Sequence, residues 1–129
     1  MRTLLIAIVI ILGFLSGGAH AEKIYKLSEL LKEIKHFEGK EVSVIAYFRD
    51  AYPDQHKFMI RENRKYIFEV HYAENQKDNF IIRFLNGLPP YSKVKLLLKG
   101  VIKGKAEPPF RIYWMELREV KVLDLGGES

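Results

Sequence analysis

The chain has 129 residues, a formal net charge of +5 at pH 7 and no cysteine. The length predicts one domain, and the mild positive charge is too small by itself to indicate nucleic-acid binding. The lack of thiols excludes disulfides, thiolate metal sites and thiol catalysis.

Residues 1–21 have the pattern of a secretory signal peptide. A positively charged start is followed by an apolar run at 3–15, and Ala19 and Ala21 form a small-x-small cleavage site before Glu22. The apolar run is shorter than the roughly 20 residues of a membrane-spanning helix, which disfavours the alternative of a retained anchor. We therefore expect a periplasmic or secreted protein that starts at Glu22 and has no membrane span after cleavage.

Residues 27–37 are predicted to form a short amphipathic helix, because apolar residues recur there at every third or fourth position. Gly39 suits the left-handed residue that ends a helix. From 42 to 49 the apolar residues alternate with others, and this period of two predicts the first strand of a sheet.

The rest of the chain has the pattern of short strands separated by polar turns. Further strands are expected at 57–62, 66–73, 80–85, 93–104 and 110–125. Gly100 interrupts the fourth of these, where a missing side chain permits a bulge or bend. The segment 80–85 is short enough for a helical turn, but its aromatic and β-branched residues favour a strand. The expected domain covers 22–125, and 126–129 is expected to be a disordered tail.

Strands at this spacing, with a glycine bend, predict a mainly β fold. We expect a small five- to six-stranded antiparallel barrel of the OB type, preceded by the short amphipathic helix. The segments that resemble an OB-fold are 37–48, 57–63 and 92–105. A signal peptide followed by one such barrel is similar to the bacterial periplasmic OB-fold family, and the first segment also resembles exported OB domains of the anticodon-binding type.

One segment departs from this resemblance. OB-folds usually place a helix between their third and fourth strands, whereas 80–92 has the pattern of a strand and a turn. The same stretch distantly resembles the haem chaperone of cytochrome c maturation. That family holds haem through a histidine near its C-terminal end, and no histidine follows His71 here. We therefore expect no haem and no other cofactor.

The candidate chemistry of the sequence is sparse. His36, His56 and His71 show no metal-ligand spacing. His36 suits a cation at the end of the helix, and a site made by the other two with a carboxylate stays open as the weaker alternative. Acidic residues occur singly, and no nucleophile or phosphate-loop motif is present. The sequence therefore predicts no catalytic residue, no metal and no enzyme.

An OB-fold binds its ligands on the face of its second and third strands, between the loop after the first strand and the loop that joins the fourth and fifth. The candidate ligand-binding residues are Tyr52, Arg61, Arg64, Lys103, Lys105 and Phe110. Aromatic and cationic side chains together can stack on rings and bind anions. Alternatively, Phe110 is the first core residue of the last strand. Lys93, Lys95 and Lys99 are expected to form a solvated strand face that also prevents edge pairing.

These observations predict an exported, non-catalytic OB-fold module that binds a small anionic or amphipathic ligand or a glycan. Two alternatives stay open. One is a protein-interaction module in envelope stress or assembly, with an envelope protein as its partner, and the other is a nucleic-acid-binding OB domain. The low net charge and the expected export from the cytoplasm argue against nucleic acid, which we do not expect as the partner. The fold alone does not decide among them.

Overall fold

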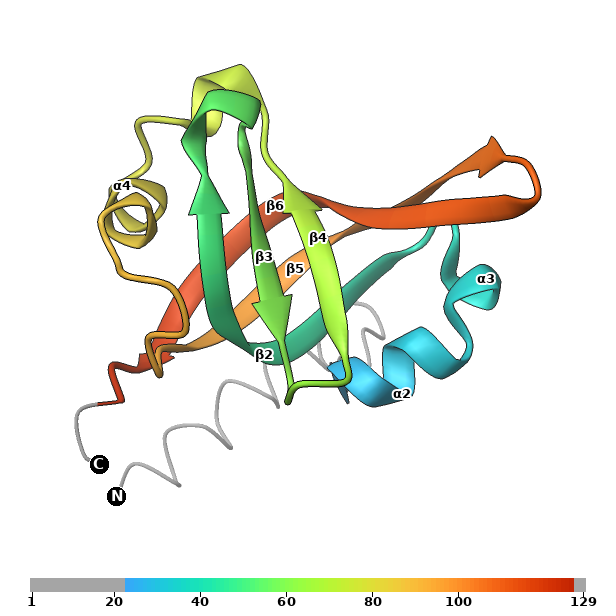
Figure 1. The fold of residues 1–129 in the computed structure, drawn as a ribbon, viewed down its shortest axis with the longest axis horizontal. Coiled ribbons are helices and arrows are strands. Elements are labelled where there is room, and N and C mark those ends of the chain that lie inside the picture. The colour runs from blue at the N-terminus through green and yellow to red at the C-terminus, as the bar shows by residue number, and fades with distance from the viewer. Residues whose placement is uncertain (1–22, 127–129) are drawn as a thin grey trace, which may run out of the picture.

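The computed structural model describes residues 23–126, so the expected signal peptide and residues 127–129 of the expected tail lie outside the described residues. The strands curl into a barrel with short helices around it (Figure 1). In chain order the elements are β1 (Ile24–Lys26), α2 (Leu27–Lys32), α3 (Ile34–Phe37), β2 (Glu41–Tyr52), η1 (Pro53–Gln55), β3 (Lys57–Arg61), β4 (Ile67–His71), η2 (Glu74–Gln76), α4 (Phe80–Asn86), β5 (Lys95–Glu107) and β6 (Phe110–Asp124).

The sheet closes on itself. Its strand order is β1-β2-β3-β4-β6-β5, and β2 also pairs with β5. Within the closed part, β4 and β6 run parallel and the other neighbours run antiparallel. This is the five-stranded Greek-key barrel of an OB-fold, so the predicted fold is confirmed. The strand β1 was not predicted; it pairs in parallel with β2.

The prediction of a strand at 80–85 is wrong, because this segment forms the helix α4 (Phe80–Asn86). Asn79 caps the helix, and its side-chain oxygen accepts hydrogen bonds from two backbone amides at 2.8 and 3.2 Å. Ile82 and Leu85, three residues apart, are buried in the core. The cap and this helical spacing outweigh the strand preference of the individual residues. The helix that OB-folds usually carry at this position is therefore present.

The amphipathic helix expected over 27–37 is present as two short helices, α2 and α3, with Glu33 between them. Leu27 and Leu30 are fully buried and attach α2 to the barrel. The α2 helix begins after Lys26, whose backbone N–H donates to the Glu29 carboxylate at 2.9 Å. Among residues 23–126, no helix is both long enough and apolar enough to cross a membrane.

The core is made by side chains that alternate along the strands and point into the barrel. They include Phe48, Phe58, Phe68, Tyr72 and Met115. The expected irregularity at Gly100 is confirmed, since the pairing of β5 with β6 shifts register between Lys99 and Gly100. A Cβ atom at Gly100 would lie only 2.5 Å from the carbonyl oxygen of Glu116. The two strands therefore approach each other at a distance that only glycine allows.

Candidate binding face

The candidate site is the outer face of β2, β3, β4 and the middle of β6, which we call the barrel face. Register places Lys57 opposite His71 and Arg61 opposite Ile67 across β3 and β4. Because successive strand residues point to opposite faces, these side chains point outward while Phe58 and its inward neighbours fill the core. The barrel face is therefore a continuous surface of half-buried polar and aromatic side chains.

One end of the barrel face holds two arginines and two tyrosines, Tyr47, Arg49, Arg61 and Tyr91, which we call the Arg61 site. The guanidinium carbon of Arg61 lies 5.6 Å from the centre of the Tyr47 ring and 5.5 Å from that of Tyr91. These distances are those of cation–π contacts. Arg49 donates from Nε to the Tyr91 hydroxyl at 3.1 Å, and its guanidinium carbon lies 5.4 Å from the same ring.

Arg61 differs from the other cations of the barrel face. In the described part of the chain its side chain makes no hydrogen bond or ion pair, and its Nε is buried without a partner. Arg49 is paired with Asp50 at 3.2 Å, and Lys57 with Glu69 at 2.8 Å. A charged group that is partly buried without an opposite charge is costly. Arg61 is therefore the cation of this face whose charge is not balanced by a carboxylate.

Tyr91 reaches the site from the loop between α4 and β5. Its backbone has a left-handed conformation, with φ of 65°, which is uncommon for a residue with a side chain. Its N–H donates to the carbonyl oxygen of Arg49 at 2.6 Å. The ring is about half exposed, at 52%, so one part of it contacts the arginines and the rest faces solvent.

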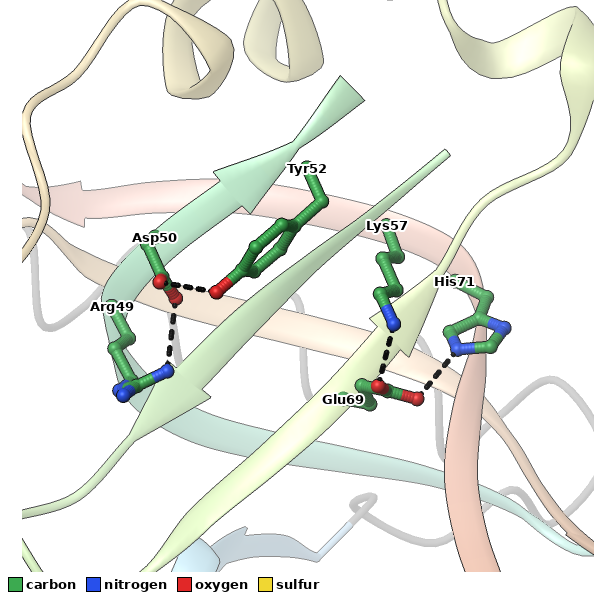
Figure 2. Close-up of polar contacts among 6 residues, drawn as sticks. All are labelled: Arg49, Asp50, Tyr52, Lys57, Glu69 and His71. Carbon is green, nitrogen blue, oxygen red and sulfur yellow. Dashed lines mark hydrogen bonds and ion pairs between the residues drawn. The ribbon is translucent and has the colours of Figure 1, made fainter. Parts of the chain in front are cut away.

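A row of polar contacts runs from the Arg61 site across the barrel face, and Figure 2 shows its members. Asp50 accepts hydrogen bonds from Tyr52 at 2.6 Å and from Arg49 at 3.2 Å. The hydrogen bond to Asp50 raises the pKa of the Tyr52 hydroxyl, since it favours the protonated form. The ammonium group of Lys57 lies 5.7 Å from the Tyr52 ring centre. Lys57 therefore connects the contacts around Asp50 to those around Glu69.

The next group is centred on Glu69, whose carboxylate lies 2.8 Å from Lys57 and 2.9 Å from His71 (Figure 2). Burial acts to raise the pKa of Glu69, but the hydrogen bonds and charges of the two neighbours outweigh it and lower the pKa. The imidazole of His71 stacks on Trp114 of β6, with ring centres 5.4 Å apart. This stacking joins the barrel face to the last strand.

Beyond the barrel, β5 and β6 continue as a two-stranded ribbon of residues 103–107 and 110–114, which projects away from the other strands (Figure 1). Register places Lys103 opposite Trp114 and Lys105 opposite Ile112. Phe110 lies on the same face as Ile112 and Trp114, because the three alternate along β6. Phe110 is 75% exposed, so the alternative that it belongs to the core is wrong.

The structure brings the six sequence-predicted residues together only in part. Tyr52 and Arg61 lie on the barrel face, and Lys103, Lys105 and Phe110 share one face of the ribbon. Arg64 is exposed in the turn between β3 and β4. The loop after β2 and the ribbon tip lie on different sides of the molecule (Figure 1), because the strands of the ribbon extend past the barrel. They do not form the single rim that the sequence suggested.

Tyr47, Arg49 and Tyr91 of the Arg61 site were not among the predicted binding residues. The period of two along β2 identifies Tyr47 and Arg49 as outward residues, so the sequence contained a signal for them. Tyr91 had no such signal, because its position depends on the course of the loop after α4. Within residues 23–126, no group of three or more histidine and acidic side chains could hold a metal ion.

No protein-family model matches the chain, and no curated protein matches its sequence at a significant level. Its fold is similar to solved structures. An aspartyl-tRNA synthetase from Entamoeba histolytica matches with a TM-score of 0.62 and 12% identity over 84% of this chain, and one from Leishmania major with a TM-score of 0.60 and 10% identity over 83%. The chain spans only 22% of the length of each synthetase.

The E. coli protein YgiW is similar along most of both chains. It has a TM-score of 0.53 and 6% identity, and the match covers 80% of this chain and 92% of YgiW. An OBody bound to hen egg-white lysozyme has a TM-score of 0.51 and 12% identity, with 69% of this chain and 84% of the OBody covered. At these identities the likeness shows the OB-fold and no specific function. The comparisons therefore give no support to the expectation that nucleic acid is not the partner.

Proposed function

We propose that this chain is an exported, non-catalytic binding module that holds a small anionic ligand at the Arg61 site. The observation that carries the proposal is the guanidinium of Arg61, which lies between two tyrosine rings without a carboxylate partner among the described residues. An anion there would supply the opposite charge and accept charge-assisted hydrogen bonds. The face of the second and third barrel strands is also where OB-folds bind.

The surroundings of Arg61 favour an anion over other ligands. The contacts with Tyr47 and Tyr91 restrict the guanidinium, so it loses less freedom when a ligand binds. Arg49 adds a second positive charge within the same site, and its own partner Asp50 is shared with Tyr52. Nε of Arg61 is buried without a partner, and no hydrogen bond of its terminal nitrogens is found among the described residues.

The export and the absence of catalysis rest on the sequence. Residues 1–21 have the order of a signal peptide, and the chain carries no cysteine and no nucleophile motif. Export is tested by the intact mass of the protein from a periplasmic fraction, which should correspond to a start at Glu22. A full-length protein recovered in the membrane pellet would show an anchor and would contradict export.

The binding proposal is tested with two simple anions, inorganic phosphate and methyl sulfate. We expect both to shift the amide NMR signals of Tyr47, Arg49 and Tyr91, with saturation at millimolar concentration in low-salt buffer. Arg61→Gln should bind both anions at least tenfold more weakly, so these shifts should disappear at the same concentrations. Arg64→Gln removes an equal charge from the neighbouring turn and should bind as the wild type does. Equal binding by both variants would show that the anion is not held by Arg61.

The ribbon supports a second candidate function, the binding of single-stranded nucleic acid. Phe110, Ile112 and Trp114 form one row, and Lys103 and Lys105 stand opposite the last two. Aromatic rings between cations are the pattern by which OB-folds hold single strands without sequence preference. A fifteen-residue oligothymidine should then quench the fluorescence of Trp114, and Phe110→Ala and Lys105→Glu should each weaken binding. If the oligomer causes no quenching at low salt, this candidate is excluded.

A further inference from the structure

A groove of about 420 Å³ lies beside the Arg61 site on the outside of the barrel. It is formed where β1 lies along β2 at the start of β5, and Tyr47 belongs to both the groove and the Arg61 site. The apolar and aromatic residues that line it are Ile24, Tyr25, Ile45, Ala46 and Tyr47. The volume is within the range of about 300–1,000 Å³ that small-molecule sites occupy.

The charged residues around the groove are mostly positive. Register places Lys26 of β1 next to Ile45, and Lys95 of β5 next to Tyr47. Both lysines line the groove. Glu62 is the one carboxylate among the lining residues, and its Oε1 already accepts a hydrogen bond from the backbone N–H of Ser28 at 2.7 Å. An apolar strip with cations on two sides and Arg61 at its end is complementary to an anion that has an apolar tail.

We propose that the ligand of this protein is an amphipathic anion with a single alkyl chain, bound as one molecule and not as a micelle. Its headgroup lies at Arg61 and its alkyl chain lies in the groove. This inference rests on the proposed function and names its ligand class. Arg61 and Arg49 hold the sulfate, phosphate or carboxylate headgroup, and the tail covers Tyr47 and extends over Ile45 toward Ile24. Each buried methylene then contributes the free energy of removing it from water.

A second apolar groove does not fit this ligand as well. It lies between α4 and the end of β6 and is lined by the exposed Phe80 and Leu125. Its charged surroundings are Asp124, Asp78 and Arg83, which do not favour an anion. This α4 groove therefore serves as the internal control for the proposal.

The test is a homologous series of n-alkyl sulfates from methyl to octyl, titrated below their micelle concentration by calorimetry and NMR. Full burial of a methylene corresponds to about a fourfold gain in affinity, so we expect a gain of about twofold to fourfold for each added carbon. Ile45→Gln should remove most of this dependence on chain length and leave methyl sulfate binding unchanged. Ile24→Gln, at a 46% exposed position, should do the same with less risk to folding. Leu125→Gln, in the α4 groove, should change nothing.

The outcomes separate this inference from the proposed function. If methyl sulfate binds through Arg61 but longer chains bind no more tightly, the tail site is wrong and the anion site stands. If Leu125→Gln rather than Ile45→Gln removes the dependence on chain length, the tail lies in the α4 groove and the inference is overturned. If Arg61→Gln leaves methyl sulfate binding intact, the proposed function itself fails.

Discussion

The imidazole of His71 stacks on the indole of Trp114, with ring centres 5.4 Å apart and ring planes at 20° to each other. The two residues are 43 positions apart in the chain, and the parallel pairing of β4 with β6 brings them together. Because Trp114 is the one tryptophan of the sequence, its fluorescence reports on the junction between the barrel face and the ribbon.

We predict that His71→Ala exposes the indole to water and shifts the emission of Trp114 to longer wavelength. The side chain of His71 is partly exposed but contacts both Trp114 and Glu69, so we expect the free energy of unfolding to fall by about 0.5–1.5 kcal/mol. His36→Ala, at the exposed end of α3, is the control and should leave the spectrum unchanged. Identical spectra for both variants would contradict the stacking.

A second prediction concerns Gly100. A Cβ atom there would lie 2.5 Å from the Glu116 carbonyl oxygen and 2.5 Å from Cγ of Met115. Gly100→Ala must therefore push β5 and β6 apart, and we expect a loss of about 1–3 kcal/mol, the magnitude of local backbone strain. Urea unfolding measures this loss.

Gly87→Ala is the matched control for Gly100→Ala. The Cβ atom of this variant would have its nearest neighbour at 3.7 Å, which is ordinary contact, and the residue has φ of −95°. We expect its unfolding midpoint to stay within about 0.5 kcal/mol of the wild type. Equal midpoints for the two variants would refute the close approach of the strands at Gly100.

The strands of this barrel could be predicted from the sequence because each has one face in the core and one in solvent. The resulting alternation is a local pattern, and it located β2, β3 and β4 within a few residues of their observed ends. It also places Arg61 on the outer face of the second barrel strand. The irregularity at Gly100 was predictable because a glycine inside an apolar strand has few other causes.

Other parts depend on contacts between distant segments. The α4 helix was missed because Phe80, Ile81 and Ile82 favour strands individually, whereas the capping side chain of Asn79 fixes the helical turn. Tyr91 was missed because no periodic pattern exists in its loop. The sequence left open whether Phe110 is exposed or belongs to the core. The distance of the ribbon residues from the first loop depends on how far β5 and β6 extend past the barrel.

A third prediction follows from the cap of α4. Asn79→Ala removes the acceptor of two backbone N–H groups at the start of the helix, and we expect it to cost about 0.5–2 kcal/mol. Asn79→Asp keeps an acceptor at the same place and adds a negative charge at the helix N-terminus, so its stability should match or exceed that of the wild type. Thermal unfolding of the three proteins decides this. If Asn79→Ala is as stable as Asn79→Asp, the cap does not contribute.

The last prediction concerns pH and Glu69. Burial acts to raise the pKa of this carboxyl, but Lys57 and His71 outweigh it and hold the pKa below its ordinary value of 4.5. A carboxyl whose pKa is lower in the folded state stabilises the fold fully above its unfolded pKa. This contribution is lost as the pH falls through the folded pKa. The wild type should therefore lose stability relative to Glu69→Gln as the pH is lowered from 6 to 3.

The measurement is the difference in free energy of unfolding between the wild type and Glu69→Gln across this range of pH. We expect the wild type to be the more stable protein at pH 6 and the difference to shrink once the pH is below 4.5, because a protonated carboxyl resembles the amide. Glu107→Gln, exposed near the ribbon tip, is the control and should differ from the wild type by less than about 0.5 kcal/mol at pH 6. A difference for Glu69→Gln that stays constant from pH 6 to pH 3 would show that Lys57 and His71 do not stabilise the ionised carboxylate.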